Sequence, residues 1–406
     1  MTFHPRIKQK LFLSTVLGSL AIATPVMALD ADDFATKLSA MSKQNGSKLS
    51  FSAIEPDGNT VVLKSVTAEA PGQPPFKLGD ITFNGVEEMG DGSYAVDSAA
   101  FSDVNVEDGP TRFSVSDIEM TGLTISADGK MSSVNDVLFY EGFSTGTISV
   151  ETNGAEVFSM SGLDLAVERP DGGTKVNMLM DGSGLKIDPS KIDDPKTRDT
   201  LQQLGYDTLT GDLKFNGSWE VESGTVDVSE YSLTLDDVGS LAMSIQISGY
   251  TLEFVKAMQQ AQVAAAANPD PQAAQQAMGF AMLGMLQQLS FKSASIRFDD
   301  ASVTERALEF AGKKQGLTGD NMRGALKGML PLMLGGLGIP DLQKQISAAA
   351  NTYLDNPQNI TISATPPSPV AVPVIMGAGM GDPKSLVDLL NVQITANEPV
   401  EICCKN

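Results

Sequence analysis

Short runs that alternate between apolar and polar residues fill residues 49–249, and they constrain the fold more than any other feature. Residues 114–118 (SVSDI) and 225–228 (TVDV) are two examples, and glycine, aspartate or asparagine closes most of the runs. A period of two places every second side chain on the same face of a β-strand. This pattern predicts half-buried antiparallel strands joined by short turns.

Two pairs of segments within this region are similar to each other. Residues 79–85 (GDITFNG) recur as residues 211–217 (GDLKFNG), and residues 56–60 (PDGNT) recur as residues 170–174 (PDGGT). The second pair has the composition of hairpin turns. We interpret the pattern as a duplicated β-unit, with copies at about 49–128 and 161–249. Independent strands and turns of similar composition are the alternative.

The offset differs between the two pairs because residues 189–207 are inserted in the second copy. Asp194 followed by Pro195 is typical of the start of a helix, so we expect a short helix there.

Apolar residues change to a helical spacing after Gly249, where alanine, glutamine, leucine and methionine dominate. We expect a helical region over about 250–357, with one inserted strand near 291–298. The remainder, 358–406, should contain a strand near 359–364, an extended proline-rich stretch over 366–373, a short helix over 383–390 and a last strand at 392–396.

These patterns predict an α+β fold. Its main element is a long, mostly antiparallel twisted sheet, or a sandwich, built from the duplicated β-unit within residues 29–250. Strands flank the helical region on both sides, so we expect the helices to pack on the sheet.

Residues 1–28 have the pattern of a secretory signal peptide. Arg6, Lys8 and Lys10 form a basic start, an apolar core follows over 11–23, and small residues precede a cleavage site between Ala28 and Leu29. The core is too short to span a bilayer. We expect an exported, periplasmic protein with no transmembrane span after removal of the signal; a retained N-terminal anchor is the alternative.

The charge of the chain is strongly acidic. Without residues 1–28, 25 basic residues stand against 50 acidic ones. Such a surface repels nucleic-acid phosphates and anionic headgroups, so we expect no nucleic-acid partner.

The two cysteines, Cys403 and Cys404, are adjacent near the C-terminus. Their Cα atoms must lie ~3.8 Å apart, below the ~4.4 to 6.8 Å that is usual for a disulfide, so a bond between them would be strained. An incidental pair in a tail, a vicinal or intermolecular disulfide and a redox role all remain open.

The only histidine, His4, lies in the predicted signal peptide. Its loss would exclude Ser-His-Asp triads, Cys-His pairs and the common zinc sites. The acidic pairs at 236–237 and 299–300 follow apolar strands and are typical of turns and helix caps, although they could also be site carboxylates. We expect no enzymatic activity, no metal and no cofactor.

The duplicated Gly-Asp-x-x-Phe-Asn-Gly unit, residues 235–241 (LDDVGSL) and residues 298–302 (FDDAS) resemble parts of secreted, β-rich bacterial envelope proteins of the YdgA-like type. The architecture is also distantly similar to that of AsmA-like and other sheet-groove lipid carriers. This resemblance implies contact with acyl chains. The chain departs from AsmA-like proteins in lacking a clear retained anchor, which puts membrane bridging in doubt.

Methionines on the predicted helices, and the run 329–339, indicate either core packing or a soft apolar lining for variable ligands. The first hypothesis is a non-enzymatic periplasmic envelope protein that binds a lipid tail or an apolar partner segment in a sheet groove. The second is a structural or assembly factor without a small ligand. The third is a carboxylate-based polysaccharide hydrolase, which needs two carboxylates ~5 to 9.5 Å apart in a cleft.

Overall fold

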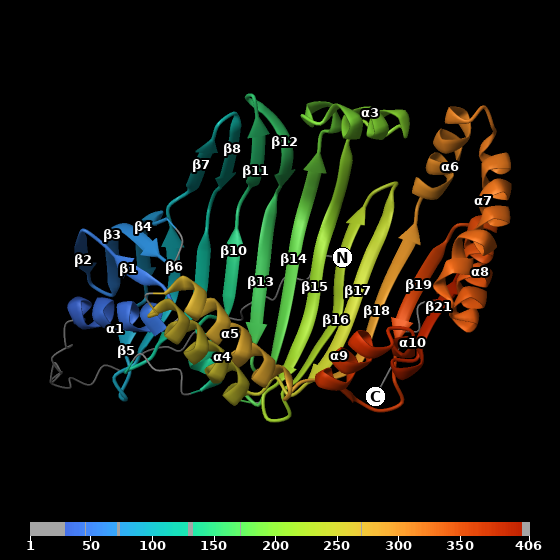
Figure 1. Cartoon of the computed structure of the whole chain (residues 1–406). Helices are drawn as coiled ribbons and strands as arrows, with labels where there is room; N and C mark the ends of the chain where they lie inside the picture. Colours follow the sequence, from blue (N-terminus) through green and yellow to red (C-terminus); the bar gives the residue numbers. More distant parts are fainter. Residues whose placement is uncertain are drawn as a thin grey trace, which may run out of the picture.

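A computed structural model describes residues 29–44, 46–70, 74–128, 133–170, 172–268 and 270–399, and one large antiparallel sheet dominates it (Figure 1). Three of the residues singled out above, Ala28, Cys403 and Cys404, lie outside the described residues. Leu29, on the other side of the expected cleavage site, is partly buried against the N-terminal core.

The main part of the sheet is an unbroken succession of neighbouring strands. In spatial order it consists of β1 (Lys48–Ser50) and β2 (Ala53–Asp57), which both pair with β3 (Thr60–Glu69), then β4 (Phe76–Asn84), β6 (Tyr94–Phe101), β9 (Glu119–Ile125), β10 (Gly142–Thr145), β13 (Gly162–Glu168), β14 (Lys175–Ile187), β15 (Leu209–Glu220), β16 (Thr225–Leu235), β17 (Gly239–Ser248), β18 (Ser290–Asp300), β19 (Asn359–Ala364) and β21 (Val392–Ala396). The predicted α+β class with a long antiparallel sheet is confirmed. Of the two arrangements left open, the structure has the continuous sheet.

A smaller group of strands extends the sheet at its upper end in Figure 1. It consists of β7 (Val104–Asp108), β8 (Thr111–Val115), β11 (Ile148–Thr152) and β12 (Ala155–Met160). Phe158 of β12 pairs with Ile187, the last residue of β14, and so joins this group to the main strands. Two short strands complete the sheet: β5 (Glu87–Glu88) beside β6 and β20 (Val370–Ala371) beside β18.

All the described helices except α1, which precedes β1, are insertions between strands. The helices are α1 (Ala31–Gln44), α2 (Val134–Val137), α3 (Pro195–Gln203) with the 3-10 turn η1 (Pro189–Lys191), α4 (Leu252–Ala266), α5 (Pro271–Leu286), α6 (Val303–Lys314), α7 (Gly319–Leu334), η2 (Gly335–Leu337), α8 (Pro340–Asp355), α9 (Val372–Gly381) and α10 (Ser385–Leu389). The pair α4 and α5 lies between β17 and β18, whereas α6 to α8 lie between β18 and β19.

Most of the element predictions hold. Both similar turn segments, 56–60 and 170–174, connect hairpins, although Asp171 lies outside the described residues. The short inserted helix is α3, and the Asp194 carboxylate accepts a hydrogen bond from the Thr197 N–H at 2.8 Å. The duplication itself stays a prediction: β4 ends at Asn84, whereas the similar segment in β15 continues to Glu220.

The C-terminal strands β19 and β21 have the predicted bounds, but the predicted extended stretch over 366–373 is too long. Helix α9, which the sequence analysis did not predict, begins at Val372 and places Pro373 in its first turn. A proline is tolerated there because the first-turn N–H groups have no partner inside the helix.

Helix α1 was not predicted either, and it builds the largest core by covering one face of β3, β4, β6 and β9. Phe34 is fully buried and packs edge-to-face on Phe83 at 5.2 Å and on Tyr94 at 5.4 Å between ring centroids. The Tyr94 hydroxyl donates to the Asp33 carboxylate at 2.8 Å, and Lys37 Nζ lies 2.5 Å from the same carboxylate. The buried hydroxyl of Tyr94 therefore has a hydrogen-bond partner, as a buried phenol requires.

The opposite edge of the sheet, β21, is covered by α8. The backbone N–H of Ile394, which points away from β19, donates to the side-chain oxygen of Gln345 on α8 at 3.1 Å. This contact satisfies a backbone group at a strand edge that would otherwise be open to pairing.

Replacement of Phe34 by alanine should lower the free energy of unfolding by about 3–5 kcal/mol, because it leaves a cavity between α1 and the sheet. Thr36→Ala, at an exposed position of the same helix, should change it by no more than about 0.5 kcal/mol. Urea unfolding followed by circular dichroism measures both. Similar values for the two variants would contradict the assigned packing.

Asp33 should make the stability depend on acidic pH. Hydrogen bonds from Lys37 and then Tyr94 lower the pKa of Asp33 in the folded state. The contribution of the Asp33 carboxylate to the free energy of unfolding is therefore complete above the unfolded pKa of about 3.9. This contribution is lost as the pH falls through the lower folded pKa. The stability difference between the wild type and Asp33→Asn should shrink between pH 5 and pH 2 in denaturant titrations; a constant difference would contradict this.

Candidate functional site

One row of directly paired residues crosses the sheet from β3 to β21, and every member is apolar or aromatic. Directly opposite residues of an antiparallel pair project from the same face, so the row marks one continuous face. Its members, strand by strand, are Val61, Phe83, Ala99, Met120, Phe143, Leu165, Met180, Phe215, Tyr231, Met243, Ile296, Ile362 and Ile394. We call this side of the sheet the apolar face.

The neighbouring row, one residue along each strand, projects from the other side and is polar. From β10 to β21 it consists of Ser144, Asp164, Asp181, Lys214, Ser232, Ala242, Arg297, Thr361 and Thr395. The Arg297 guanidinium makes a salt bridge to Asp299 on this same side, with a nitrogen-oxygen distance of 2.7 Å. The charged residues of this row are thus separated from the apolar face by the thickness of the sheet.

Within the described residues, helices cover parts of the apolar face: α1 packs over β3, β4, β6 and β9, and α4 packs over β13 to β15. Under α1, Val61 and Phe83 are at most 3% exposed, whereas Tyr231, Met243 and Ile296 in the central strands are 40%, 37% and 48% exposed. An exposed contiguous apolar surface of this kind marks a binding site more often than scattered single residues do.

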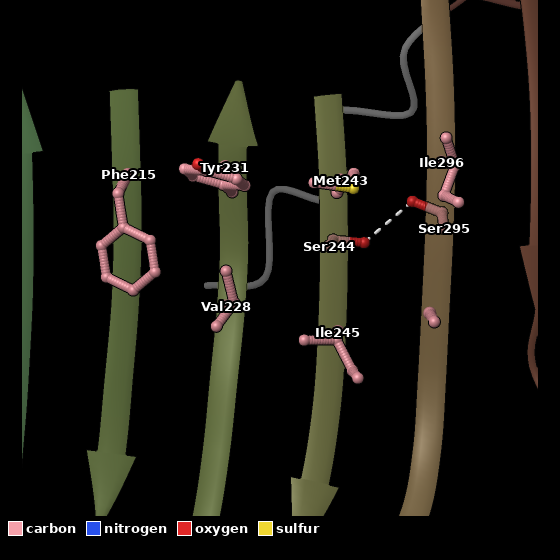
Figure 2. A pocket seen from close by; sticks show the side chains of 9 residues that line it. Phe215, Val228, Tyr231, Met243, Ser244, Ile245, Ser295 and Ile296 are labelled. Carbon is pink, nitrogen blue, oxygen red and sulfur yellow. Dashed lines mark hydrogen bonds between the residues drawn. The ribbon is translucent and has the colours of Figure 1, made fainter. Parts of the chain in front are cut away.

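The exposed centre of the apolar face is hollowed. A depression of about 470 Å³ lies over β15 to β18 and is lined on this side by Phe215, Val228, Tyr231, Met243, Ile245 and Ile296 (Figure 2). We call it the central hollow. None of these six side chains carries a charge. Between Met243 and Ile245, Ser244 points to the reverse side and shares a hydrogen bond of 2.8 Å with Ser295.

A β-bulge keeps the lining residues of β16 on one side. Val228 and Tyr231 are three residues apart, an odd spacing that would place them on opposite faces of a regular strand. The register shifts between them, and the extra residue is absorbed at Ser229, whose hydroxyl donates to the Asn216 carbonyl at 3.1 Å. Both side chains therefore reach the central hollow.

Helix α4 closes the lower end of the apolar face. The indole N–H of Trp219, which is only 4% exposed, donates to the Tyr250 carbonyl at 2.7 Å, immediately before the helix. Tyr250 packs edge-to-face on the Trp219 ring at 5.9 Å and against Phe254 at 5.0 Å. This aromatic group anchors the start of α4 beside the central hollow.

The acidic pairs considered as site carboxylates have structural partners. The Asp300 carboxylate accepts from the Thr304 N–H at 2.9 Å, at the start of α6, and from the Tyr353 hydroxyl at 3.1 Å. Asp236 accepts from the Thr210 hydroxyl at 2.6 Å, and Asp237 lies in the β16–β17 turn with a positive φ of 58°. These contacts agree with the interpretation as turn and cap residues.

Tyr353 is perturbed by this environment. Burial raises its pKa to about 12, the hydrogen bond with Thr304 opposes the shift, and the nearby Asp300 carboxylate adds to it. The phenol therefore stays protonated at neutral pH, where it can donate to Asp300.

Among the described residues, no group of three or more histidine, cysteine, aspartate or glutamate side chains could hold a metal ion. In the same part of the chain, no helix has both the length and the apolar character needed to cross a membrane.

A sheet groove was predicted from the sequence, but the lining residues singled out for it lie on the methionine-rich helices, whereas strands build the central hollow. One sequence signal could have located the central hollow: the change from even-numbered to odd-numbered apolar positions within a strand. In β16 the apolar positions shift from Val226 and Val228 to Tyr231, Leu233 and Leu235, which predicts a bulge. The pairing partners of each strand, however, are not encoded locally.

Comparisons with known proteins match only part of the chain. A family model described as "Uncharacterized protein" matches residues 232–397, which run from within β16 to just past β21 and include the β17 and β18 side of the central hollow. A search of curated proteins finds no match.

The exit from β17 into α4 should be intolerant of side chains. Gly249 has a φ of +92°, and a Cβ there would lie 1.9 Å from the Gln288 carbonyl oxygen. Gly249→Ala should cost at least about 1–3 kcal/mol of stability. Gly284→Ala, in an open position within α5, should instead stabilise by up to about 1 kcal/mol. Thermal unfolding of both variants measures the difference; equal melting temperatures would contradict the assigned turn.

Proposed function

We propose that the protein is a non-enzymatic envelope protein of the periplasm that holds lipid acyl chains, or an apolar segment of a partner, on the apolar face of its sheet. The observation that carries this proposal is the central hollow: six uncharged apolar or aromatic side chains on an open sheet face, with Lys214 and Arg297 of the same strands on the reverse side. Flexible methionine and rotatable aromatic side chains suit ligands of variable shape.

The dimensions of the apolar face support an acyl chain as ligand. From Phe215 to Ile394 the row crosses six strands, which at ~4.8 Å per strand is about 24 Å. One leaflet of a bilayer has a hydrocarbon thickness of about 15 Å, half of the ~30 Å core. A complete lipid tail can therefore lie across the strands without leaving the row.

Sequence features support the location and the absence of catalysis. The pattern of residues 1–28 supports export, and the position of His4 within them supports a mature protein without imidazole. The resemblance to YdgA-like envelope proteins and to sheet-groove lipid carriers points in the same direction. A polysaccharide hydrolase is less favoured, because Asp299 and Asp300 are held by Arg297 and by Thr304 and Tyr353.

Introducing two charges into the central hollow should abolish lipid binding. We expect native mass spectrometry of the exported protein, purified without detergent, to show adducts of lipid mass, and we expect Met243→Glu combined with Ile245→Glu to lose them. Organic extraction of the same samples identifies the adducts.

The matched control adds the same two charges to the reverse side, as Asn216→Glu combined with Thr234→Glu, and should keep the adducts. A wild-type protein without adducts that also takes up no added fatty acid would contradict the proposal and favour an assembly factor without a small ligand.

A further inference from the structure

Three helices outside the central hollow expose large apolar side chains to an unusual degree. Phe280 on α5 is 75% exposed, Leu332 and Met333 on α7 are 82% and 68% exposed, and Met380 on α9 is 81% exposed. None of these residues packs in either buried core of the described chain. Large exposed apolar side chains that gather in one region are typical of a surface that meets a partner or an apolar environment.

The surfaces of α5 and α9 lie at one end of the sheet, and the C-terminal end of α7 approaches them. Helices α4 and α5 leave β17 after Ser248 and return at Ser290, and these two residues pair with each other. Ala371, which pairs with Ser290, leads directly into α9 (Figure 1). The far end of α7 joins this group, because Lys384 Nζ, between α9 and α10, lies against Gly338.

The same helix surfaces lack charge in a strongly acidic protein. Neither α5 nor α9 contains a single charged residue, and α7 has none after Lys327. The whole chain, by contrast, is 19% charged and has a net charge of −22. This composition matches an uncharged apolar environment and offers no attraction for anionic headgroups or for a basic protein surface.

We propose that these surfaces of α5, α7 and α9 dock this end of the protein onto a lipid bilayer with net-neutral headgroups. Scattered protruding side chains on separate helices can each enter a fluid interface, whereas a rigid protein partner must match their relief. None of the described helices is long enough to cross the bilayer, so the contact is peripheral. The proposal rests on residues that do not line the central hollow and is independent of acyl-chain binding.

Vesicle flotation of the exported protein tests the proposal. The wild type should float with phosphatidylcholine vesicles, and Phe280→Ser combined with Leu283→Ser should lower the bound fraction about tenfold or more. Met380→Ser on α9 should weaken binding independently. Added salt should have little effect with neutral vesicles, and anionic lipid should reduce binding by repelling the acidic body.

The matched control removes a similar apolar surface from the opposite end of the strands. Val106→Ser combined with Phe113→Ser changes a paired, exposed couple of β7 and β8 and should leave flotation unchanged. Melting temperatures of all variants should stay near that of the wild type, because the replaced side chains are exposed.

Absence of flotation in the wild type, equal flotation of the wild type and the α5 variant, or binding only to anionic vesicles would each overturn the proposal. A concentration-dependent dimer that the α5 variant loses, without flotation, would instead assign these surfaces to a second copy of the chain. Acyl-chain adducts are measured separately, so a failure of vesicle docking is distinguishable from a failure of the central hollow.

Discussion

Cross-strand register is the constraint on which the rest of this structure depends. Each strand alternates by itself, but a continuous apolar face arises only because Phe215, Tyr231, Met243 and Ile296 are direct partners in successive pairs. A slip of one residue in any pair would bring the row of Lys214 to the apolar side. The burial of side chains under α1 favours a single register for β3 to β9, and burial under α4 does the same for β13 to β15.

The cover over the apolar face is uneven. Phe34 is fully buried between α1 and the sheet, and Trp219 fixes the start of α4, but none of the described helices buries the side chains that line the central hollow. The helices that follow Gly249 place much of their apolar surface outside instead. Met243 and Ile296 stay exposed to water, so the fold does not gain the stabilisation that their burial would add. Exposed apolar patches of this kind often mark interaction sites.

The alternation of residues 49–249 was sufficient to predict the strands, and Asp194 and Pro195 were sufficient to predict α3. Helix α1 was missed because its hydrophobic spacing follows soon after the apolar run of residues 11–23, and α9 because glycine and proline disfavour helices in isolation. The central hollow was beyond local patterns. It depends on which strands become neighbours and on where the bulge at Ser229 falls, and both follow from contacts between residues far apart in the chain.

The contact between Gln345 and Ile394 has a consequence for the size of the molecule. A sheet whose last strand presents free backbone groups can gain further strands from any chain that pairs with that edge. The width of the sheet would then vary with the protein concentration. Here helix α8 ends the sheet at β21. The β21 edge of the apolar face is consequently set within one chain and stays the same at any protein concentration.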